Sequence, residues 1–471
     1  MLRSIISSLV NVFRIPELRR KLLITLMLLA VYRVGIYVTI PGIDVNVLGQ
    51  VIKKSTEATG QTDSASSRAV SIVDMFSGGA LSHCGLFALG IMPYISASII
   101  FQLLTTVIKP LEELSKEGEA GRKKINQYTR YATVGLCLVW GFTTARWVEG
   151  LKADDLSAVV PNPGMGFELA SIVTLTAGTI FLMWLGEQID EYGIGNGISL
   201  IIMAGIVARM PSAMFQMIRT KFEMTFRPAE GRFGLVMLLV LAAMYVAVVV
   251  AVIIIQQGQR RITVQTAKQT RGRRVYGGQQ HYMPLRVNHA GVIPIIFAQS
   301  LLTFPGLLVR MVANRVSPAD HPALARFMSG MASQLSIGAF GYVVVYVIMI
   351  FFFCFFWTAV AFNPVKMAED WKQYGHFVPG IRPGKRTAEY LERLMTRITL
   401  AGAAFLAAVA ILPQLFNKYL NLDWQMASIY GGTGLLIVVG VALDVVQKIE
   451  SHLLMRHYDG FIKGHPVRGR R

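Results

Sequence analysis

Clusters of arginine and lysine are the residues in this chain whose type and spacing most suggest chemistry. One segment contains Gly258-Gln-Arg-Arg261, Lys268 and Arg271-Gly-Arg-Arg274. Clustered guanidinium groups bind phosphate oxygens through paired hydrogen bonds, which predicts ribosomal RNA or anionic lipid headgroups as partners. The same charges could instead only set the orientation of neighbouring membrane spans.

A second basic segment contains the octapeptide Phe377-Val-Pro-Gly-Ile-Arg-Pro-Gly384. Two prolines and two glycines within eight residues predict a stiff turn that holds Arg382 outward. A generic turn would account for the glycines. It would not need an apolar residue immediately before an isolated arginine, so a docking role is the sharper interpretation.

Motifs of catalysis and of metal or cofactor binding are missing from the sequence. HExxH, GxSxG and paired carboxylates within the apolar runs do not occur. The glycines of Tyr192-Gly-Ile-Gly-Asn-Gly-Ile198 follow no strand and precede no Walker lysine, which favours a tight turn between helices. Cys84, Cys137 and Cys354 have no metal-ligand spacing and are interpreted as packing residues. We therefore expect no enzyme activity and no cofactor.

The composition indicates what kind of fold carries these basic loops. Hydrophobic residues make up 53% of the 471 residues and charged residues only 15%, and the apolar residues form long uncharged blocks. Lipid is the solvent that such blocks require. We predict an all-α polytopic membrane protein with ten transmembrane helices, at 22–40, 85–108, 131–148, 169–186, 194–215, 233–255, 290–309, 338–362, 398–417 and 424–443.

The distribution of basic residues predicts the orientation of these spans. Of 46 Lys and Arg residues, 31 lie on the side of the amino terminus, 14 on the other side, and Arg33 lies within the first span. The positive-inside rule then places both termini in the cytoplasm, and only the loop that begins at Arg209 goes against it. Residues 1–21 are expected to form an amphipathic leader on the membrane surface, and 451–471 a basic cytoplasmic tail.

One short apolar segment precedes the second span. It is Ile72-Val-Asp-Met-Phe-Ser-Gly-Gly-Ala-Leu81, which is too short to cross a bilayer and is continuous with the span. Non-helical backbone at membrane depth needs protein or water around it, so this segment is either a re-entrant plug or an amphipathic turn that rests on the headgroups. The residues alone leave both interpretations open.

Several long motifs resemble the SecY family of protein-conducting channels of the general secretory pathway. The resemblance covers nearly the whole chain. Gln256 and Gln257 depart from it, because the family commonly has an acid followed by a base there, and the polar insert 51–68 is longer than usual. The matching motifs include Ile40-Pro-Gly-Ile-Asp44, Met75-Phe-Ser-Gly-Gly-Ala-Leu-Ser82, Ala88-Leu-Gly-Ile-Met-Pro-Tyr-Ile-Ser-Ala-Ser-Ile-Ile100, Arg122-Lys-Lys-Ile-Asn-Gln-Tyr-Thr-Arg-Tyr131, Gly193-Ile-Gly-Asn-Gly-Ile-Ser199, Gly258-Gln-Arg-Arg261, Ala290-Gly-Val-Ile-Pro294 and Phe377 to Gly384.

The resemblance implies two inverted five-helix halves, 22–218 and 219–450, around a central pore. It also implies a waist closed by a ring of apolar side chains, which excludes ions by dewetting yet widens around a polypeptide. The spacing of two isoleucine pairs by four residues places each pair on one helix face. The matching ring positions are Ile91, Ile95, Ile198, Ile202, Ile296 and Ile437.

The same resemblance assigns the remaining candidate sites. It makes the segment 72–81 the plug, with Ile72, Val73, Met75, Phe76, Gly78, Gly79 and Leu81 as its members. It implies a lateral gate whose polar residues are Gln102, Thr105, Gln299 and Ser300. It places partner docking on the cytoplasmic loops 256–289 and 363–397, at Arg260, Arg261, Lys268, Arg273, Arg274 and Arg382.

The predicted function is therefore a central channel subunit in the bacterial inner membrane, which passes unfolded preproteins and releases hydrophobic segments sideways into lipid. The implied partners are the small membrane subunits SecE and SecG, the SecA motor ATPase, the ribosome, signal-sequence-bearing preproteins and anionic lipids. Two rival classes are an ion-coupled transporter and a scaffold that only recruits ribosomes. The scarcity of intramembrane carboxylates counts against the transporter. A scaffold would lack a path for a polypeptide.

Overall fold

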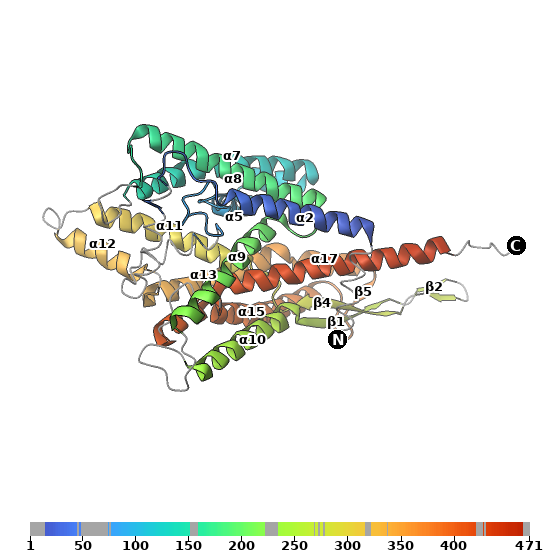
Figure 1. Ribbon diagram of the computed structural model, residues 1–471. Helices are drawn as coiled ribbons and strands as arrows, with labels where there is room; N and C mark the ends of the chain where they lie inside the picture. The colour runs from blue at the N-terminus through green and yellow to red at the C-terminus, as the bar shows by residue number, and fades with distance from the viewer. Residues whose placement is uncertain are drawn as a thin grey trace. The chain divides into compact units, whose positions relative to one another are not determined.

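The computed structural model describes residues 15–44, 47–48, 74, 77–150, 159–221, 234–267, 269–271, 274–276, 278–315, 322–336, 338–420, 427 and 430–464. These residues are mostly helical (Figure 1). The chain divides into two compact units. The first comprises Met1–Arg219 and Ile437–Arg471, and the second comprises Thr220–Leu436.

The first unit is a set of packed helices. Within it, α7 packs against α5 and α8, and α8 also packs against α2. Its helices are α2 (Pro16–Gly35), α5 (Met92–Val107), α6 (Lys109–Lys116), α7 (Glu119–Glu149), α8 (Met165–Tyr192), α9 (Gly197–Lys221) and the part of α17 (Gly432–Gly464) that begins at Ile437.

The second unit combines helices with short strands. In it α13 packs against α11 and α15, and α14 packs against α15. Its elements are α10 (Leu235–Gln257), β1 (Gln259–Thr266), β2 (Gln269–Arg271), β3 (Arg274–Tyr276), β4 (Gln280–Arg286), α11 (Ile293–Arg315), α12 (Pro322–Gln334), α13 (Phe340–Ala361), α14 (Pro364–Gln373), β5 (His376–Phe377) and α15 (Lys385–Leu420).

Each predicted span contains a helix, but not all of these helices have the length and composition of a membrane span. Among the described residues, five helical segments pass that test, or six if the bent pair α5 and α6 is one span. The five are Met165–Tyr192, Leu235–Gln257, Phe340–Gln373, Lys385–Leu420 and Gly432–Leu453. The count of ten stays a prediction. Of the predicted leader, residues 1–14 lie outside the described part, and Pro16 already begins α2.

The second predicted span differs most from the structure at its ends. Residues 85–91 are turns rather than helix, and α5 begins only at Met92. Gly90 has a φ of 57°, which a right-handed helix cannot contain, and Pro93 occupies the first turn of α5, where its missing N–H is not needed. At the other end the chain bends by 99° into α6, because Pro110 cannot donate the hydrogen bond that would continue α5.

Helix α8 forms the centre of the first unit. Its buried leucines and isoleucine at 175, 182 and 189 repeat every seven residues, so they lie along one face. On that helix a side chain at Gly178 would collide with the carbonyl oxygen of Leu86, since its Cβ would lie 2.2 Å from that atom. The glycine thus allows the turn region 85–91 to lie directly on α8, which positions the segment between the predicted plug and α5.

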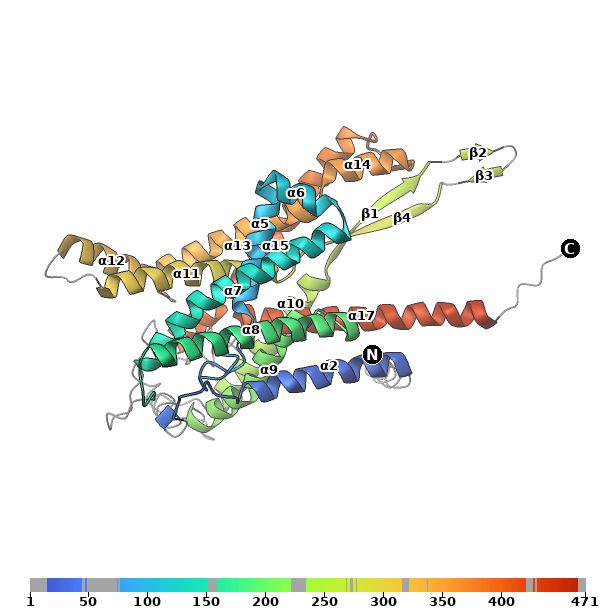
Figure 2. The ribbon, with the colours of Figure 1, turned by 90° about the horizontal axis from the view of Figure 1, so that it is seen from above.

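Strands β1, β4 and β5 join the two basic loops of the second unit into one antiparallel sheet. Arg260 of β1 lies opposite Leu285 of β4, and Gln265 lies opposite Phe377 of β5, in the order β4-β1-β5. The inward side chains Ile262 and Leu285 are buried against residues of α15. Strands β1 and β4 form a hairpin. In Figure 2 this hairpin extends beyond α15 to the paired strands β2 and β3 at its tip.

Candidate functional site

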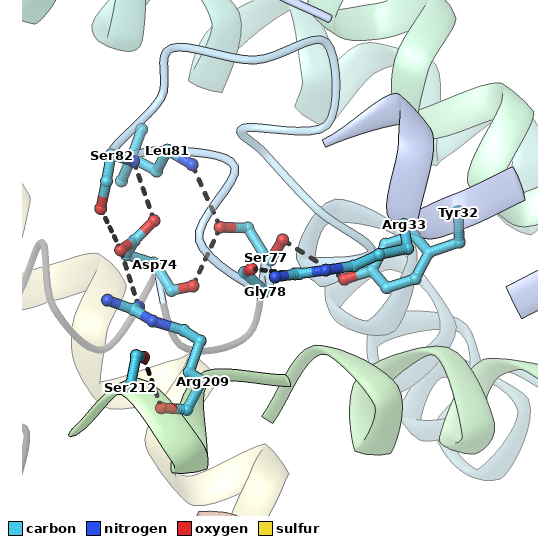
Figure 3. Close-up of polar contacts among 9 residues, drawn as sticks. All are labelled: Tyr32, Arg33, Asp74, Ser77, Gly78, Leu81, Ser82, Arg209 and Ser212. Carbon is cyan, nitrogen blue, oxygen red and sulfur yellow. Dashed lines mark hydrogen bonds and ion pairs between the residues drawn. The ribbon is translucent and has the colours of Figure 1, made fainter. Parts of the chain in front are cut away.

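The described part of the predicted plug is a tight turn that its own polar groups close. Asp74 and Ser77 are only 2% and 1% exposed. The Asp74 carboxylate accepts hydrogen bonds from the Ser82 backbone N–H, at 2.9 Å, and from the Ser82 hydroxyl (Figure 3). The Ser77 hydroxyl donates to the Asp74 carbonyl and accepts from the Leu81 N–H. A buried carboxylate without such donors would be costly, so this network keeps the turn folded.

An ion pair connects this turn to helix α9. Nη1 of Arg209 lies 2.7 Å from Oδ2 of Asp74, whose side chain is 3% exposed, whereas that of Arg209 is 26% exposed. The geometry is visible in Figure 3, where the guanidinium reaches up from α9 to the carboxylate. Because the pair is shielded from water on the Asp74 side, its attraction is stronger than that of a surface pair.

Helix α2 contacts the same turn from another side. The Tyr32 hydroxyl donates to the Ser77 carbonyl oxygen at 3.3 Å, and the Arg33 guanidinium donates to that of Gly78 at 3.1 Å. Gly78 has a φ of 70°, and its Cα approaches Gly205 of α9 so closely that a Cβ there would lie 3.0 Å from the Gly205 Cα. The turn is thus held between α2 and α9, and we call residues 74 and 77–82 the latched turn.

Sequence reasoning missed the role of the two arginines. The sequence indicates Arg209 only as a charge that interrupts the span 194–215 and belongs to the loop that goes against the positive-inside rule, and Arg33 only as a charge in the first span that pairs helices. In the structure both bind the latched turn. The available signal was a pair of opposite charges, Asp74 and Arg209, each of which interrupts an apolar run. Among the plug residues, Gly78, Gly79 and Leu81 belong to the latched turn, whereas Ile72, Val73, Met75 and Phe76 lie outside the described residues.

The predicted ring positions divide between the two units. Ile91 and Ile95 are 1% and 8% exposed at the start of α5, and Ile202 and Ile437 are also buried. Ile198 is half-buried, and its Cγ1 lies 3.2 Å from where a Cβ on Gly186 of α8 would be. These five belong to the first unit and Ile296 to the second, so the closed ring stays a prediction.

The predicted gate residues are divided in the same way. On α5, Gln102 is exposed, and the half-buried Thr105 donates its hydroxyl to the Gln102 carbonyl of its own helix, at 2.8 Å. On α11 of the second unit, Gln299 and Ser300 are both buried. The Thr105 bond stays within its own helix, and hydrogen bonds across a gate stay a prediction.

The predicted docking arginines share one structural support. Arg260 and Arg261 are exposed at the beginning of β1, and Arg382 is exposed on the turn that follows β5. The turn is stabilised by the Thr387 hydroxyl, which donates to the Arg382 carbonyl at 2.9 Å, while Val378 is buried below it. Arg274 belongs to β3, and Lys268 and Arg273 lie outside the described residues. The two basic loops therefore present their charges from one sheet.

Within the part of the chain that the structure describes, no group of three or more His, Cys, Asp or Glu residues could hold a metal ion. Cys84, Cys137 and Cys354 are buried free thiols, in keeping with a packing role. Several helices that are long and apolar enough to cross a membrane, a buried charged turn in the first unit and basic loops in the second together define a polytopic helical membrane protein.

Comparison with known proteins identifies the family. The sequence model of the SecY family matches residues 85–446, and this chain belongs to that family. The protein translocase subunit SecY of Thermotoga maritima is 39% identical over 98% of this chain and 99% of its own length. A solved protein-conducting channel aligns with a TM-score of 0.56 at 17% identity, over 98% of this chain and 99% of its own. A SecY structure described for a plug domain that stabilises the closed state aligns with a TM-score of 0.54, at the same identity and coverage.

Proposed function

We propose that this chain is the central channel subunit of a protein translocase, which passes unfolded preproteins across the membrane and releases hydrophobic segments laterally into lipid. Membership of the SecY family supports the channel. The observation that carries the proposal is the latched turn, in which backbone without regular helix is buried and bonded to two helices. Such backbone at membrane depth needs surrounding protein, which is what a plug within a channel has.

In this proposal the latched turn is the plug of the resting channel. Asp74 and Arg209 hold it to α9, and Tyr32 and Arg33 hold it to α2. The burial of Ala80 and Leu81 gives the turn an apolar side suited to fill a vestibule. For the channel to open, the Asp74 carboxylate must separate from Arg209. It would then either be hydrated or keep its hydrogen bonds from Ser82.

The waist of the channel would be the isoleucine ring. Branched apolar side chains disfavour a water column and hydrated ions, yet they offer an extended polypeptide no specific binding. Ile91 directly precedes α5 and Ile95 lies in its first turn, with the Ile95 N–H bonded to the Ile91 carbonyl at 3.1 Å, which supports their stacking along one face. For lateral release, the family resemblance implies a gate lined by Gln102 and Thr105 of α5 and by Gln299 and Ser300 of α11.

Partners would supply the driving force, because the chain has no nucleotide-binding motif of its own. The exposed arginines 260, 261 and 382 support docking of the SecA motor and the ribosome on the shared sheet. Exposed apolar side chains on α2 and α10, such as Met27 and Leu239, suit either lipid or the small subunits SecE and SecG. The predicted location is the bacterial inner membrane, with both termini in the cytoplasm.

Site-specific crosslinking tests the channel. A secretory preprotein stalled during export should crosslink to Ile91→Cys and Ile95→Cys in membranes that contain the full translocase. Val173→Cys on α8 is the control, because that side chain is 66% exposed on the helix surface and should face lipid. Equal labelling at all three positions, or none with a chain verified as inserted, would contradict a polypeptide path past the ring.

Lateral release needs a separate measurement. A signal sequence that carries a photoreactive residue should crosslink to Gln102→Cys and Ser300→Cys and, later, to lipid. If the signal reaches lipid with no contact at either position, release takes place elsewhere.

A further inference from the structure

Helix α12 (Pro322–Gln334) follows α11 and precedes α13, on the side of the second unit opposite the basic loops. It packs against α11 and lies beside it in both Figure 1 and Figure 2. Its last residue meets α13, because a Cβ at Gly341 would lie only 3.1 Å from the carbonyl oxygen of Gln334. The carbonyl oxygen of the next residue, Leu335, lies 3.6 Å from where a Cβ on Gly306 of α11 would be. The end of α12 is thus held against both neighbouring helices.

One exposed face of α12 is polar. It consists of Arg326, Ser329 and Ser333, which follow one another at the three- and four-residue intervals that place side chains on one side of a helix. The Ser329 hydroxyl donates to the Arg326 carbonyl at 3.0 Å, within the same helix. Met328 and Ala332 form a separate, half-buried face. The polar face is therefore the one suited to water.

A second exposed face of α12 is apolar. Phe327 and Met331 lie four residues apart on it, and their exposed fractions are 64% and 37%. Because a helix turns by about 100° per residue, the middle of this face lies about 180° from Ser329. A helix with a half-buried side, a polar exposed side and an apolar exposed side meets three surroundings, which are protein, water and a third, apolar medium.

The place where α12 ends indicates how deep it lies in the membrane. Helix α13 belongs to a segment that is long and apolar enough to cross a membrane, and it begins at Phe340, whose side chain is 82% exposed. Since Gln334 lies against Gly341, α12 ends where we expect the hydrocarbon of the bilayer to begin. With a rise of about 1.5 Å per residue, Met331 and Phe327 lie at most about 5 and 11 Å above that level. The headgroup layer is about 5–8 Å thick, so a tilted α12 places both side chains in it.

We propose that α12 is an interfacial helix, which inserts Phe327 and Met331 into the membrane surface opposite the basic loops. Burial of apolar side chains supplies the attraction, so the contact requires no charged headgroup. The exposed beginning of α13 continues this lipid-facing surface. The membrane surface would then hold one end of α11, the helix that carries the predicted ring residue Ile296. The inference goes beyond the channel function, and its test involves no translocation.

Spin labelling of the full-length protein in liposomes of phosphatidylcholine, which carries no net charge, measures where this face lies. A nitroxide is attached to Phe327→Cys, Met331→Cys or the control Ser329→Cys, in a background that lacks the three native cysteines. Its collisions with oxygen, which concentrates in lipid, are compared with its collisions with a water-soluble nickel chelate. The ratio of oxygen to nickel collisions at positions 327 and 331 should exceed that at 329 by about fivefold or more, since removal of even one polar group from water is disfavoured by about that factor.

Two other results would overturn the proposal. Equal ratios at all three positions would show that the apolar face lies in water, where a soluble partner could reach it. Few collisions with either reagent at positions 327 and 331 would show that protein covers this face, either another part of the chain or a second copy.

A second pair of variants tests whether Phe327 itself holds the helix in the membrane surface. With the label at Met331→Cys, Phe327→Asp should increase the nickel collisions by about fivefold, because a carboxylate on this face favours water over lipid. The control Ser329→Asp introduces the same residue into the same helix, but on the polar face, and should leave the collisions unchanged. An equal increase in both variants, or no increase in Phe327→Asp, would refute the lipid contact.

Discussion

Replacement of Arg209 by alanine should release the latched turn, which we propose to be the plug of the resting channel. The substitution leaves the Asp74 carboxylate 3% exposed with only its Ser82 donors. Breaking a fully buried ion pair costs about 3–5 kcal/mol, and because Arg209 is itself 26% exposed the cost here should be about 2–3 kcal/mol. That free energy raises the ratio of displaced to seated plug by roughly 30- to 150-fold. A plug displaced in roughly 0.1% of resting channels would then be displaced in about 3–13%.

Two measurements report this shift. Planar-bilayer recordings should show a higher resting ion conductance for the variant than for the unsubstituted protein. Alkylation of Cys84 by a hydrophilic maleimide should also accelerate. Cys84 is only 1% exposed and its backbone N–H donates to the carbonyl of Leu81 in the latched turn, so displacement of the turn should expose the thiol. The alkylation experiment uses a background in which Cys137 and Cys354 are replaced by alanine.

A matched control is Arg146→Ala. Arg146 also forms an arginine–carboxylate pair in the first unit, with Glu168 at 2.9 Å, but its side chain is 61% exposed and its partners Glu149 and Glu168 are not part of the latched turn. This variant should neither leak nor expose Cys84. If Arg209→Ala, with an unchanged melting temperature, shows the resting conductance and Cys84 reactivity of the unsubstituted protein, the ion pair does not hold the plug.

Three further outcomes are expected from the same structure. Gly205→Val should also expose the Cys84 thiol, because a Cβ at position 205 would lie 3.1 Å from the Cα of Gly78 in the latched turn. The control Gly135→Val should not expose it, since a Cβ at position 135 would have nothing within 4 Å. Ile91→Ser combined with Ile95→Ser should raise resting conductance, because hydroxyl groups let water fill the waist; conductance equal to that of the parent would count against dewetting. Arg382→Glu should reduce motor-driven export in vesicles more than signal-sequence binding, and equal losses would remove its assigned role.

The sequence predicted where the helices lie because their apolar runs are long and nearly uncharged. It did not predict their ends equally well. The apolar run from Gly85 continues without a break into α5, so hydropathy cannot show that Gly90 and Pro93 delay the helix to Met92. Helix α15 begins at Lys385, well before its apolar part. Its first residues are polar, so hydropathy did not predict this part of the helix.

The strands illustrate a different limit. The alternation of Ile262 and Val264 with polar residues is an ordinary strand signal that hydropathy analysis of spans overlooks. The pairing of β1 with β5 joins residues from two separate loops, and no local pattern predicts such a contact. The ion pair between Asp74 and Arg209 also joins residues that lie far apart in the sequence. Two opposite charges within apolar runs could nevertheless have suggested it.

The sheet of β4, β1 and β5 connects the two basic loops through a short strand pairing. Among the described residues, Gln265 and Thr266 of β1 are in register with Phe377 and His376 of β5. Two further hydrogen bonds cross here, from the Ala267 N–H to the Gly375 carbonyl and between the Thr266 hydroxyl and Nδ1 of His376. A weak force on the loop that carries Arg382 would thus be transmitted to β1, whereas a stronger force would break the short β1–β5 pairing before it separated β1 from β4, which pair along nearly the whole of both strands. A partner bound to one basic loop would therefore displace the other loop as well, as long as the force stayed below what these few hydrogen bonds resist.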